Sequence, residues 1–180
     1  PLKVRSFLIE DCEIGIYSIQ SSLNLEYGTI KNSLHYGVYA DLAHQMTNIS
    51  SCKFLGNQNS ITGVRFNGIP GVGEIIIKQS LIKDFKYGFH NDNGNARIPC
   101  TEITNCRFEG IGLFAGDLTL NHADGGSFSK VHTNKQGIYV TPSATFDLNN
   151  GYARLDNDRI INGYLNLYLP YKIARTVLPT

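Results

Sequence analysis

Short stretches in which apolar and polar residues alternate recur along the chain, three in each repeating unit. In one clear unit they cover residues 47–49, 52–54 and 64–66. Alternation with a period of two is typical of a β-strand that buries one face. The pattern therefore predicts three short strands in each unit and no helix of normal length.

Tight corners are predicted between these strands. Only two residues separate the first strand from the second, as at Ser50-Ser51, Lys78-Gln79 and Thr104-Asn105. Small and polar residues tolerate the backbone conformations that such a corner needs. A glycine begins the third strand, which suits a bend with positive φ.

These glycines recur at a nearly constant interval, with spacings of 22, 26, 25, 24, 25 and 26 residues. A fixed period of this length is typical of stacked supersecondary units. The seven glycines are Gly15, Gly37, Gly63, Gly88, Gly112, Gly137 and Gly163.

Three strands in each turn, with turns stacked about 4.8 Å apart, form a parallel β-helix. Parallel crossovers are right-handed. We therefore predict an all-β fold, a right-handed parallel β-helix of about seven coils with three short strands per coil. Residues 1–163 are predicted to form the coils, and residues 164–180 the last strand and a C-terminal cap or linker. Because the chain opens inside a repeat, we expect it to be a fragment of a longer helix.

This pattern resembles the right-handed parallel β-helix (pectate-lyase-like) family, and is closest in character to the β-helix domains of phage tailspikes and depolymerases. The resemblance covers nearly the whole chain and concerns the fold, which hosts lyases, hydrolases, epimerases and binding proteins. It implies a homotrimer of parallel rods. The run Arg97–Glu102 begins like the Arg-x-Pro-x-x-Arg element of pectate lyases but lacks its second arginine. This difference argues against a calcium-dependent lyase.

Composition narrows the possible partners. The net charge is +1 and charged residues make up 17% of the chain, which argues against a dedicated nucleic-acid or membrane surface. The chain has no run of 18 apolar residues, so we expect no membrane insertion.

A phrase of the form Ile-x-x-Cys places three cysteines, Cys12, Cys52 and Cys106, in one predicted inward column. They would lie in alternate coils, about 9–10 Å apart, which is too far for a disulfide. We therefore predict free buried thiols, which fit folding in a reducing cytosol. No spacing of Cys or His matches a zinc site, and no metal or cofactor is predicted.

Two columns of side chains are predicted to point outward, at positions two and four after each glycine. The position-two column is Tyr17, Tyr39, Arg65, His90, Phe114, Tyr139 and Leu165. The position-four column is Ile19, Asp41, Asn67, Asp92, Gly116 and Thr141. Sugar rings could stack on the aromatics, or the aromatics could pack against a neighbouring subunit.

Candidate site residues come mainly from these columns. Glycoside hydrolysis uses two carboxylates, about 5 Å apart in retaining enzymes and about 6.5–9.5 Å apart in inverting ones. A lyase needs a base and a cation that neutralises a uronate. The catalytic candidates are Asp92, Asp117, Asp41 and His90, and the substrate-binding candidates are Tyr17, Tyr39, Arg65, Asn67 and Tyr139. Asp84 and Glu109 are expected on a different corner. The alternative is that these polar residues belong to an ordinary solvated surface.

Two polar segments, residues 67–73 and 91–99, are predicted to be loops that leave the same corner of neighbouring coils. Binding residues often lie on such loops over a rigid scaffold.

The leading hypothesis is a segment of a phage tailspike or related virion fibre, assembled in the host cytoplasm, that recognises a cell-surface polysaccharide. Whether the segment also depolymerises that polysaccharide is left open at this point. A secreted polysaccharide lyase or glycoside hydrolase is the first alternative. A structural shaft or adhesin without catalysis is the second.

Overall fold

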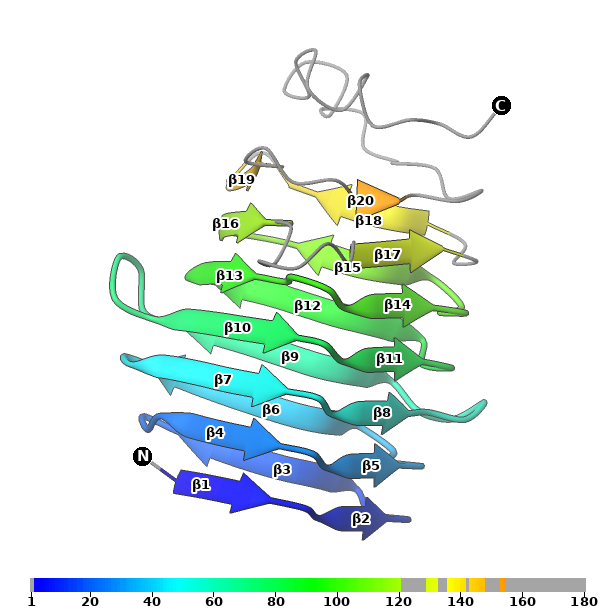
Figure 1. The fold of residues 1–180 in the computed structure, drawn as a ribbon. Helices are drawn as coiled ribbons and strands as arrows, with labels where there is room; N and C mark the ends of the chain where they lie inside the picture. Colours follow the sequence, from blue (N-terminus) through cyan, green and yellow to red (C-terminus); the bar gives the residue numbers. More distant parts are fainter. Residues whose placement is uncertain (1, 121–128, 133–135, 142, 148–152, 155–180) are drawn as a thin grey trace.

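The computed structural model describes residues 2–120, 129–132, 136–141, 143–147 and 153–154. Over these residues the chain winds as a right-handed parallel β-solenoid, in which each coil gives one strand to each of three sheets (Figure 1). The predicted fold and the three strands per coil are confirmed. No helix in this part of the chain is long and apolar enough to cross a membrane.

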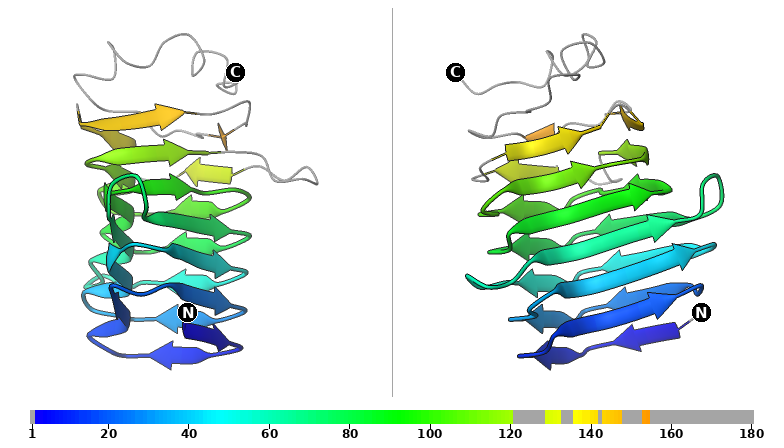
Figure 2. Two further views of the ribbon diagram at one scale, coloured as in Figure 1. Left: turned by 90° about the vertical axis from the view of Figure 1, so that its left-hand side faces the viewer. Right: turned by 180° about the vertical axis from the view of Figure 1, so that it is seen from behind.

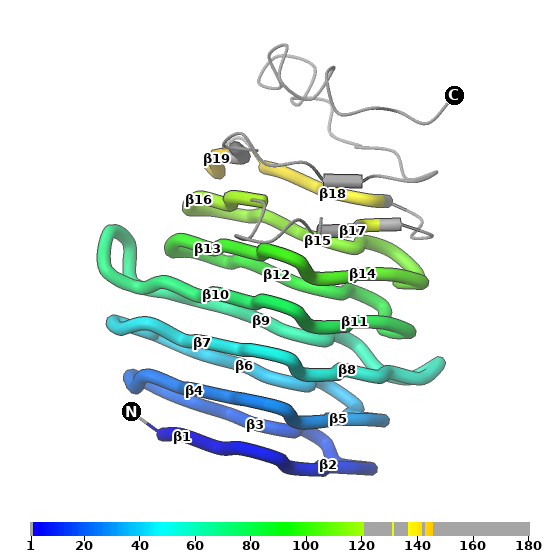
Figure 3. Tube along the Cα trace, in the orientation of Figure 1, coloured from blue at the N-terminus to red at the C-terminus, as the bar shows by residue number. Residues whose placement is uncertain are grey.

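The three sheets run along the axis of the solenoid (Figures 2 and 3). Sheet A contains β1 (Leu2–Arg5), β4 (Leu23–Glu26), β7 (Met46–Ser50), β10 (Glu74–Lys78), β13 (Asn95–Arg97), β16 (Gly116–Thr119) and β19 (Ala144–Asp147). Sheet B contains β2 (Leu8–Glu10), β5 (Thr29–Lys31), β8 (Lys53–Leu55), β11 (Leu81–Lys83), β14 (Glu102–Thr104), β17 (Ser129–His132) and β20 (Ala153–Arg154). Sheet C contains β3 (Ile14–Ile19), β6 (Tyr36–Ala43), β9 (Thr62–Gly68), β12 (Tyr87–Asn93), β15 (Glu109–Leu113) and β18 (Gln136–Val140).

The core is a stack of aliphatic and phenylalanine side chains inside the coils. Leu25, Ile49 and Ile77 are paired along sheet A, and all three are fully buried. Phe54 and Ile82 continue the same arrangement in sheet B. Burial of one such side chain contributes about 1.5–3 kcal/mol to folding, so the stacked columns stabilise each coil on its neighbours.

Residues with positive φ form the corners. Ser51 has a φ of 55° and Gln79 a φ of 51°, both at the turn from sheet A to sheet B. Asn105 has a φ of 54° at the turn from sheet B to sheet C, and its side chain donates a 2.6 Å hydrogen bond to Asp84 on the preceding coil. The predicted tight corners are confirmed between sheets A and B, and a second, similar corner lies between sheets B and C.

This second corner makes the prediction of a single cysteine column wrong. Ile49 and Cys52 follow each other at the turn between sheets A and B, whereas the equivalent phrases at Cys12 and Cys106 lie between sheets B and C. Both corners demand the same residue types, so local sequence cannot tell them apart. None of the four cysteines is in a disulfide, as predicted for Cys12, Cys52 and Cys106. Cys52 and Cys106 are buried, as predicted, but Cys12 is only partly buried.

The glycine column also needs a correction in the fifth coil. Tyr87 pairs with Glu109 and Phe89 with Ile111, which places Gly110, not Gly112, beside Gly88. The next coil continues this register, because Ile111 pairs with Ile138. The spacing of the repeat cannot distinguish the two glycines, because Gly110 and Gly112 both fit the expected interval.

Other predictions in this region are also wrong. Phe108 follows Cys106 in the same phrase that holds Cys52 and the buried Phe54, which predicts a core position, but Phe108 is 42% exposed. Residues 91–99 are not a loop, because β12 continues to Asn93, and β13 starts at Asn95 after a turn at Gly94, whose φ is 88°. The connection after Gly68, by contrast, does link β9 to β10. Gly163, Leu165 and the predicted cap at 164–180 lie outside the described residues.

Candidate functional site

The outer face of sheet C carries the candidate site. Tyr17, Tyr39, Arg65 and His90 occupy equivalent positions on neighbouring strands, as the position-two column predicts. On β15, however, the residue beside His90 is Gly112. Phe114 lies further along the chain, and its amide donates to the carbonyl of Asn91, so that it lies beside Asp92.

Gly112 leaves space that the neighbouring side chains fill. A Cβ built at Gly112 would lie 2.6 Å from Glu109 Oε2 and 2.7 Å from His90 Cδ2. Both distances are too short for a real contact. Because residue 112 has no side chain, the ends of the His90 and Glu109 side chains can pack against its backbone.

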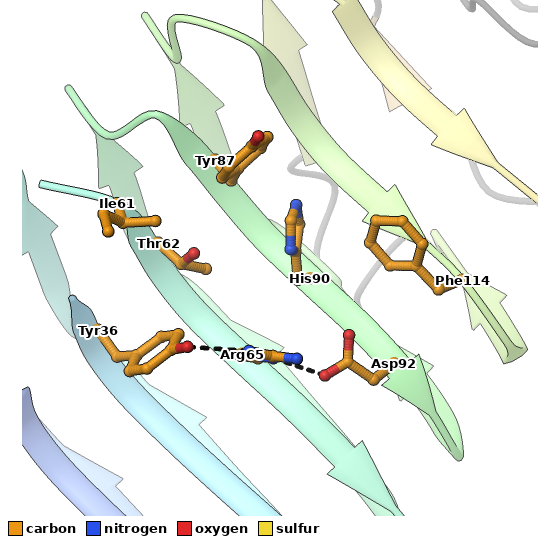
Figure 4. Close-up of a pocket in the computed structure, with 8 residues that line it drawn as sticks. All are labelled: Tyr36, Ile61, Thr62, Arg65, Tyr87, His90, Asp92 and Phe114. Atoms are coloured by element: carbon orange, nitrogen blue, oxygen red, sulfur yellow. Dashed lines mark hydrogen bonds and ion pairs between the residues drawn. The ribbon is translucent and has the colours of Figure 1, made fainter.

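A shallow pocket of about 330 Å³ lies on this face, spanning β6, β9, β12 and β15 (Figure 4). This volume is at the small end of the ~300–1,000 Å³ range of ligand sites. Four polar side chains, Thr62, Arg65, His90 and Asp92, share the lining with aromatic and apolar ones. The lining residues are Tyr36, Ile61, Thr62, Arg65, Tyr87, His90, Asp92 and Phe114.

Arg65 and Asp92 form an ion pair at one side of the pocket. Arg65 donates from Nε to Asp92 Oδ2 at 2.5 Å and from Nη1 to the Tyr36 hydroxyl at 2.8 Å. Its guanidinium carbon lies 5.2 Å from the centre of the Tyr39 ring, a cation–π contact. Partial burial opposes the charged form, but the hydrogen bond and negative charge of Asp92 outweigh it and raise the pKa of Arg65.

A second group of residues continues from Arg65 toward the N-terminal coil. The rings of Tyr17 and Tyr39 stack with centres 5.2 Å apart. Asp41 accepts hydrogen bonds from Asn67 Nδ2 at 2.9 Å and from the Tyr17 hydroxyl at 3.4 Å. Burial and the charge of Asp41 raise the pKa of Tyr39 to about 12. These residues are the expected neighbours on the sheet, but only Arg65 lines the pocket.

His90 lies among aromatic rings. Its ring centre is 4.5 Å from that of Tyr87 and 5.0 Å from that of Phe114. His90 Nε2 lies 3.3 Å from Glu109 Oε2, and both side chains are largely buried. Both atoms are buried and neither completes a hydrogen bond with the described residues. Phe114 in turn contacts Tyr139, with ring centres 5.8 Å apart.

The structure does not bring Asp117 to this site. Asp117 lies on β16 in sheet A, where it pairs with Asn95 and is exposed. Gly116, expected in the outward column, lies on the same strand with a φ of 78°. Both errors follow from the wrong choice of glycine, which shifts every later position in that coil by two residues. Asp84 lies at a corner beside Asn105, as expected.

Sequence reasoning missed four residues of this face: Tyr36, Thr62, Tyr87 and Glu109. They share one position, immediately before the column glycine, as the pairing of Tyr87 with Glu109 shows. The signal was available in the repeat, since Tyr36-Gly37, Tyr87-Gly88 and Glu109-Gly110 align once Gly110 is chosen. The expectation that Glu109 lies on a different corner is therefore wrong.

The described residues contain no group of three or more His, Cys, Asp or Glu side chains that could hold a metal ion. The side chains of the pocket offer hydrogen bonding at Arg65 and Asp92 and ring stacking at Tyr87 and Phe114.

Fold and site together define a parallel β-solenoid with an aromatic and polar pocket on one sheet. Comparison with protein families, with curated proteins and with solved structures gives no match.

Proposed function

We propose that the chain is a β-helix segment of a tailspike-like virion fibre that recognises a cell-surface polysaccharide through the outer face of sheet C. One observation carries this proposal. The pocket combines the aromatic rings of Tyr87 and Phe114 with the hydrogen-bonding groups of Arg65 and Asp92. A sugar residue offers the matching surface, with apolar C–H faces and hydroxyl edges. A few placed polar groups within an apolar lining are typical of small-molecule sites.

The rigidity of the face supports the same proposal. Tyr36, Arg65 and Asp92 hold one another through two hydrogen bonds, and each comes from a different strand. Side chains that are already ordered lose little conformational entropy on binding. Tyr17 is 50% exposed at the N-terminal end of this face, so a longer glycan chain could extend beyond the pocket and contact it.

Depolymerisation of the bound chain is a second candidate activity, favoured by His90. A histidine held beside a carboxylate is a common arrangement for a general acid or base. Asp92 and Asp41 remain candidates as well, although Arg65 and Asn67 already donate hydrogen bonds to them. A secreted lyase or glycoside hydrolase would use the same residues.

A homotrimer of parallel rods remains part of the proposal. In the alternative of a shaft or adhesin, the aromatics of sheet C would be buried between subunits. Native mass spectrometry measures the oligomeric state, and exposure of Tyr17 to a tyrosine-modifying reagent in that oligomer separates the two arrangements. Modified Tyr17 in a trimer supports an open binding face, and protected Tyr17 supports the shaft.

The binding test uses an array of bacterial surface glycans, followed by titration calorimetry on any ligand found. We expect Tyr87→Ala to weaken binding about tenfold, because one aromatic contact contributes about 0.5–1.5 kcal/mol beyond its buried area. The matched control is Tyr27→Ala, since Tyr27 is 66% exposed at a corner between sheets A and B. Mass spectrometry of the bound glycan would show new reducing ends for a hydrolase and unsaturated uronates for a lyase. A folded protein that retains no glycan would contradict the proposal.

A further inference from the structure

The charges around the pocket balance. Arg65 is the only lining residue with a permanent positive charge, and Asp92 neutralises it at 2.5 Å. Glu109 adds a second carboxylate behind His90. Lys86 places its ammonium over Tyr87 and Phe108, at 5.3 and 5.1 Å from the ring centres, and does not line the pocket. The charged groups around the pocket therefore leave no excess of positive charge.

The guanidinium of Arg65 is also partly occupied by hydrogen bonds within the protein. Tight binding of a carboxylate uses two parallel N–H groups of one guanidinium. In Arg65 the Nε–H points to Asp92, and an N–H of Nη1 points to the Tyr36 hydroxyl. Two of the five N–H groups of Arg65 are therefore in use. A carboxylate that approached the others would lie close to the negative charge of Asp92.

Hydroxyl groups are a better match for this pocket. Asp92 uses Oδ2 for Arg65, and its other oxygen points away from Arg65, toward the space between His90 and Phe114 (Figure 4). An ionised carboxylate is an acceptor with capacity for several hydrogen bonds. Two rings, Tyr87 and Phe114, lie on either side of His90 and can contact the apolar face of the same ligand.

We infer that the pocket binds a neutral sugar residue, and that it discriminates against uronates and other acidic sugars. This inference rests on the proposed function and names its substrate class. The sugar donates hydroxyls to Asp92 and stacks an apolar face against Tyr87 or Phe114. Arg65 holds Asp92 in place rather than receiving a carboxylate from the ligand.

Two experiments on the full chain test the inference. The first measures binding across a bacterial glycan array that contains both neutral and acidic polymers. Polygalacturonate and the galactan made from it by carboxyl reduction are added as a chemically matched pair. We expect the neutral polymers to be retained and the acidic ones to bind at least tenfold more weakly.

The second experiment removes the neutralising charge. In Asp92→Asn, the positive charge of Arg65 is no longer balanced, while the shape of the side chain is kept. We expect binding of the neutral ligand to fall about tenfold, because a hydrogen bond to a charged group is lost. Binding of polygalacturonate should rise and should weaken again as salt is added. The control is Glu74→Gln, which frees Arg97 from a similar 2.6 Å ion pair on sheet A.

The outcomes separate this inference from the proposed function. Preferential binding of acidic polymers by the wild-type chain overturns the neutral-sugar assignment and leaves glycan recognition intact. Equal gains of polygalacturonate binding in Asp92→Asn and Glu74→Gln also overturn it, because the effect would then reflect net charge alone. Failure of every glycan to bind the folded protein removes both.

Discussion

Gly112 is the position without a side chain in the row of outward residues on sheet C that contains Arg65 and His90. The side chains of His90 and Glu109 occupy the space beside it. The inward glycine Gly88 differs sharply from it. A Cβ at Gly88 would lie 2.5 Å from the backbone oxygen of Gly110, whereas a Cβ at Gly112 meets the ends of two flexible side chains. One glycine is therefore required by the fold, and the other by the pocket.

Gly112→Ala should weaken glycan binding about tenfold or more while the protein stays folded. His90 and Glu109 must move away, but the backbone can stay in place. Gly112 is buried, so the added methyl group overpacks this position, but only the ends of two side chains have to move. We therefore expect a loss of about 1 kcal/mol in the free energy of unfolding, at the low end of the cost of overpacking. Gly88→Ala, the matched control, overpacks the core and should cost about 1–3 kcal/mol or more. Urea unfolding and calorimetry measure both effects; unchanged glycan binding in Gly112→Ala would count against a role for this gap.

The corner between sheets A and B is an element with its own polar chemistry. Ser80 accepts a hydrogen bond from the Cys52 amide at 3.1 Å and donates one to the Lys78 carbonyl at 2.8 Å. Thr101 repeats this one coil later, accepting a hydrogen bond from the Ser80 amide at 3.4 Å and donating to the Pro99 carbonyl at 3.2 Å. Buried hydroxyls thus satisfy backbone groups that the turn removes from the sheet ladders.

Ser80→Ala should lower the free energy of unfolding by about 1–3 kcal/mol, because it leaves the buried Cys52 amide without its acceptor. Ser143→Ala, at an exposed position, should change stability by no more than about 0.5 kcal/mol. Urea denaturation of both variants tests the difference. Equal midpoints for the two would mean that water or a neighbouring group replaces the Ser80 hydroxyl.

On the scale of the whole molecule, the stacking of coils separates the cysteines. Cys12 and Cys106 lie at the same corner, but four coils apart, which is about 19 Å at the usual strand spacing. Disulfide formation requires Cα atoms within about 7 Å. Burial raises the pKa of the Cys52 thiol, which makes it a poor nucleophile in the folded protein.

The folded protein should therefore show four free thiols by intact mass, with Cys52 and Cys106 unreactive toward a thiol reagent until it unfolds. The folded state holds the Cys52 proton more tightly than the unfolded chain does. The protonated thiol therefore contributes to the free energy of unfolding, and this contribution is complete below the ordinary thiol pKa of 9.0. It is lost as the pH rises above that value. Cys52→Ala should reduce this alkaline loss, and rapid labelling of native Cys52 would contradict the burial.

The repeat was sufficient to predict the solenoid from the sequence. Periodic glycines, two-residue corners and alternating apolar residues each determine local backbone structure. Because similar coils stack on one another, the structure of one coil is enough to predict the fold of the solenoid. The outward position of Tyr17, Tyr39, Arg65 and His90 followed from the same alternation. The neighbours Asp41 and Asn67 followed in the same way.

Only the tertiary structure decided the register of the coils whose sequences are ambiguous. Gly110 and Gly112 both suit the repeat, and backbone pairing between β12 and β15 selects Gly110. That choice brings Glu109 to His90 and leaves Asp117 on another sheet. Because successive strand positions alternate between core and solvent, register depends on hydrogen bonds between segments more than 20 residues apart. Local sequence predicts that a strand exists, but only contacts between coils decide which residue lies beside which.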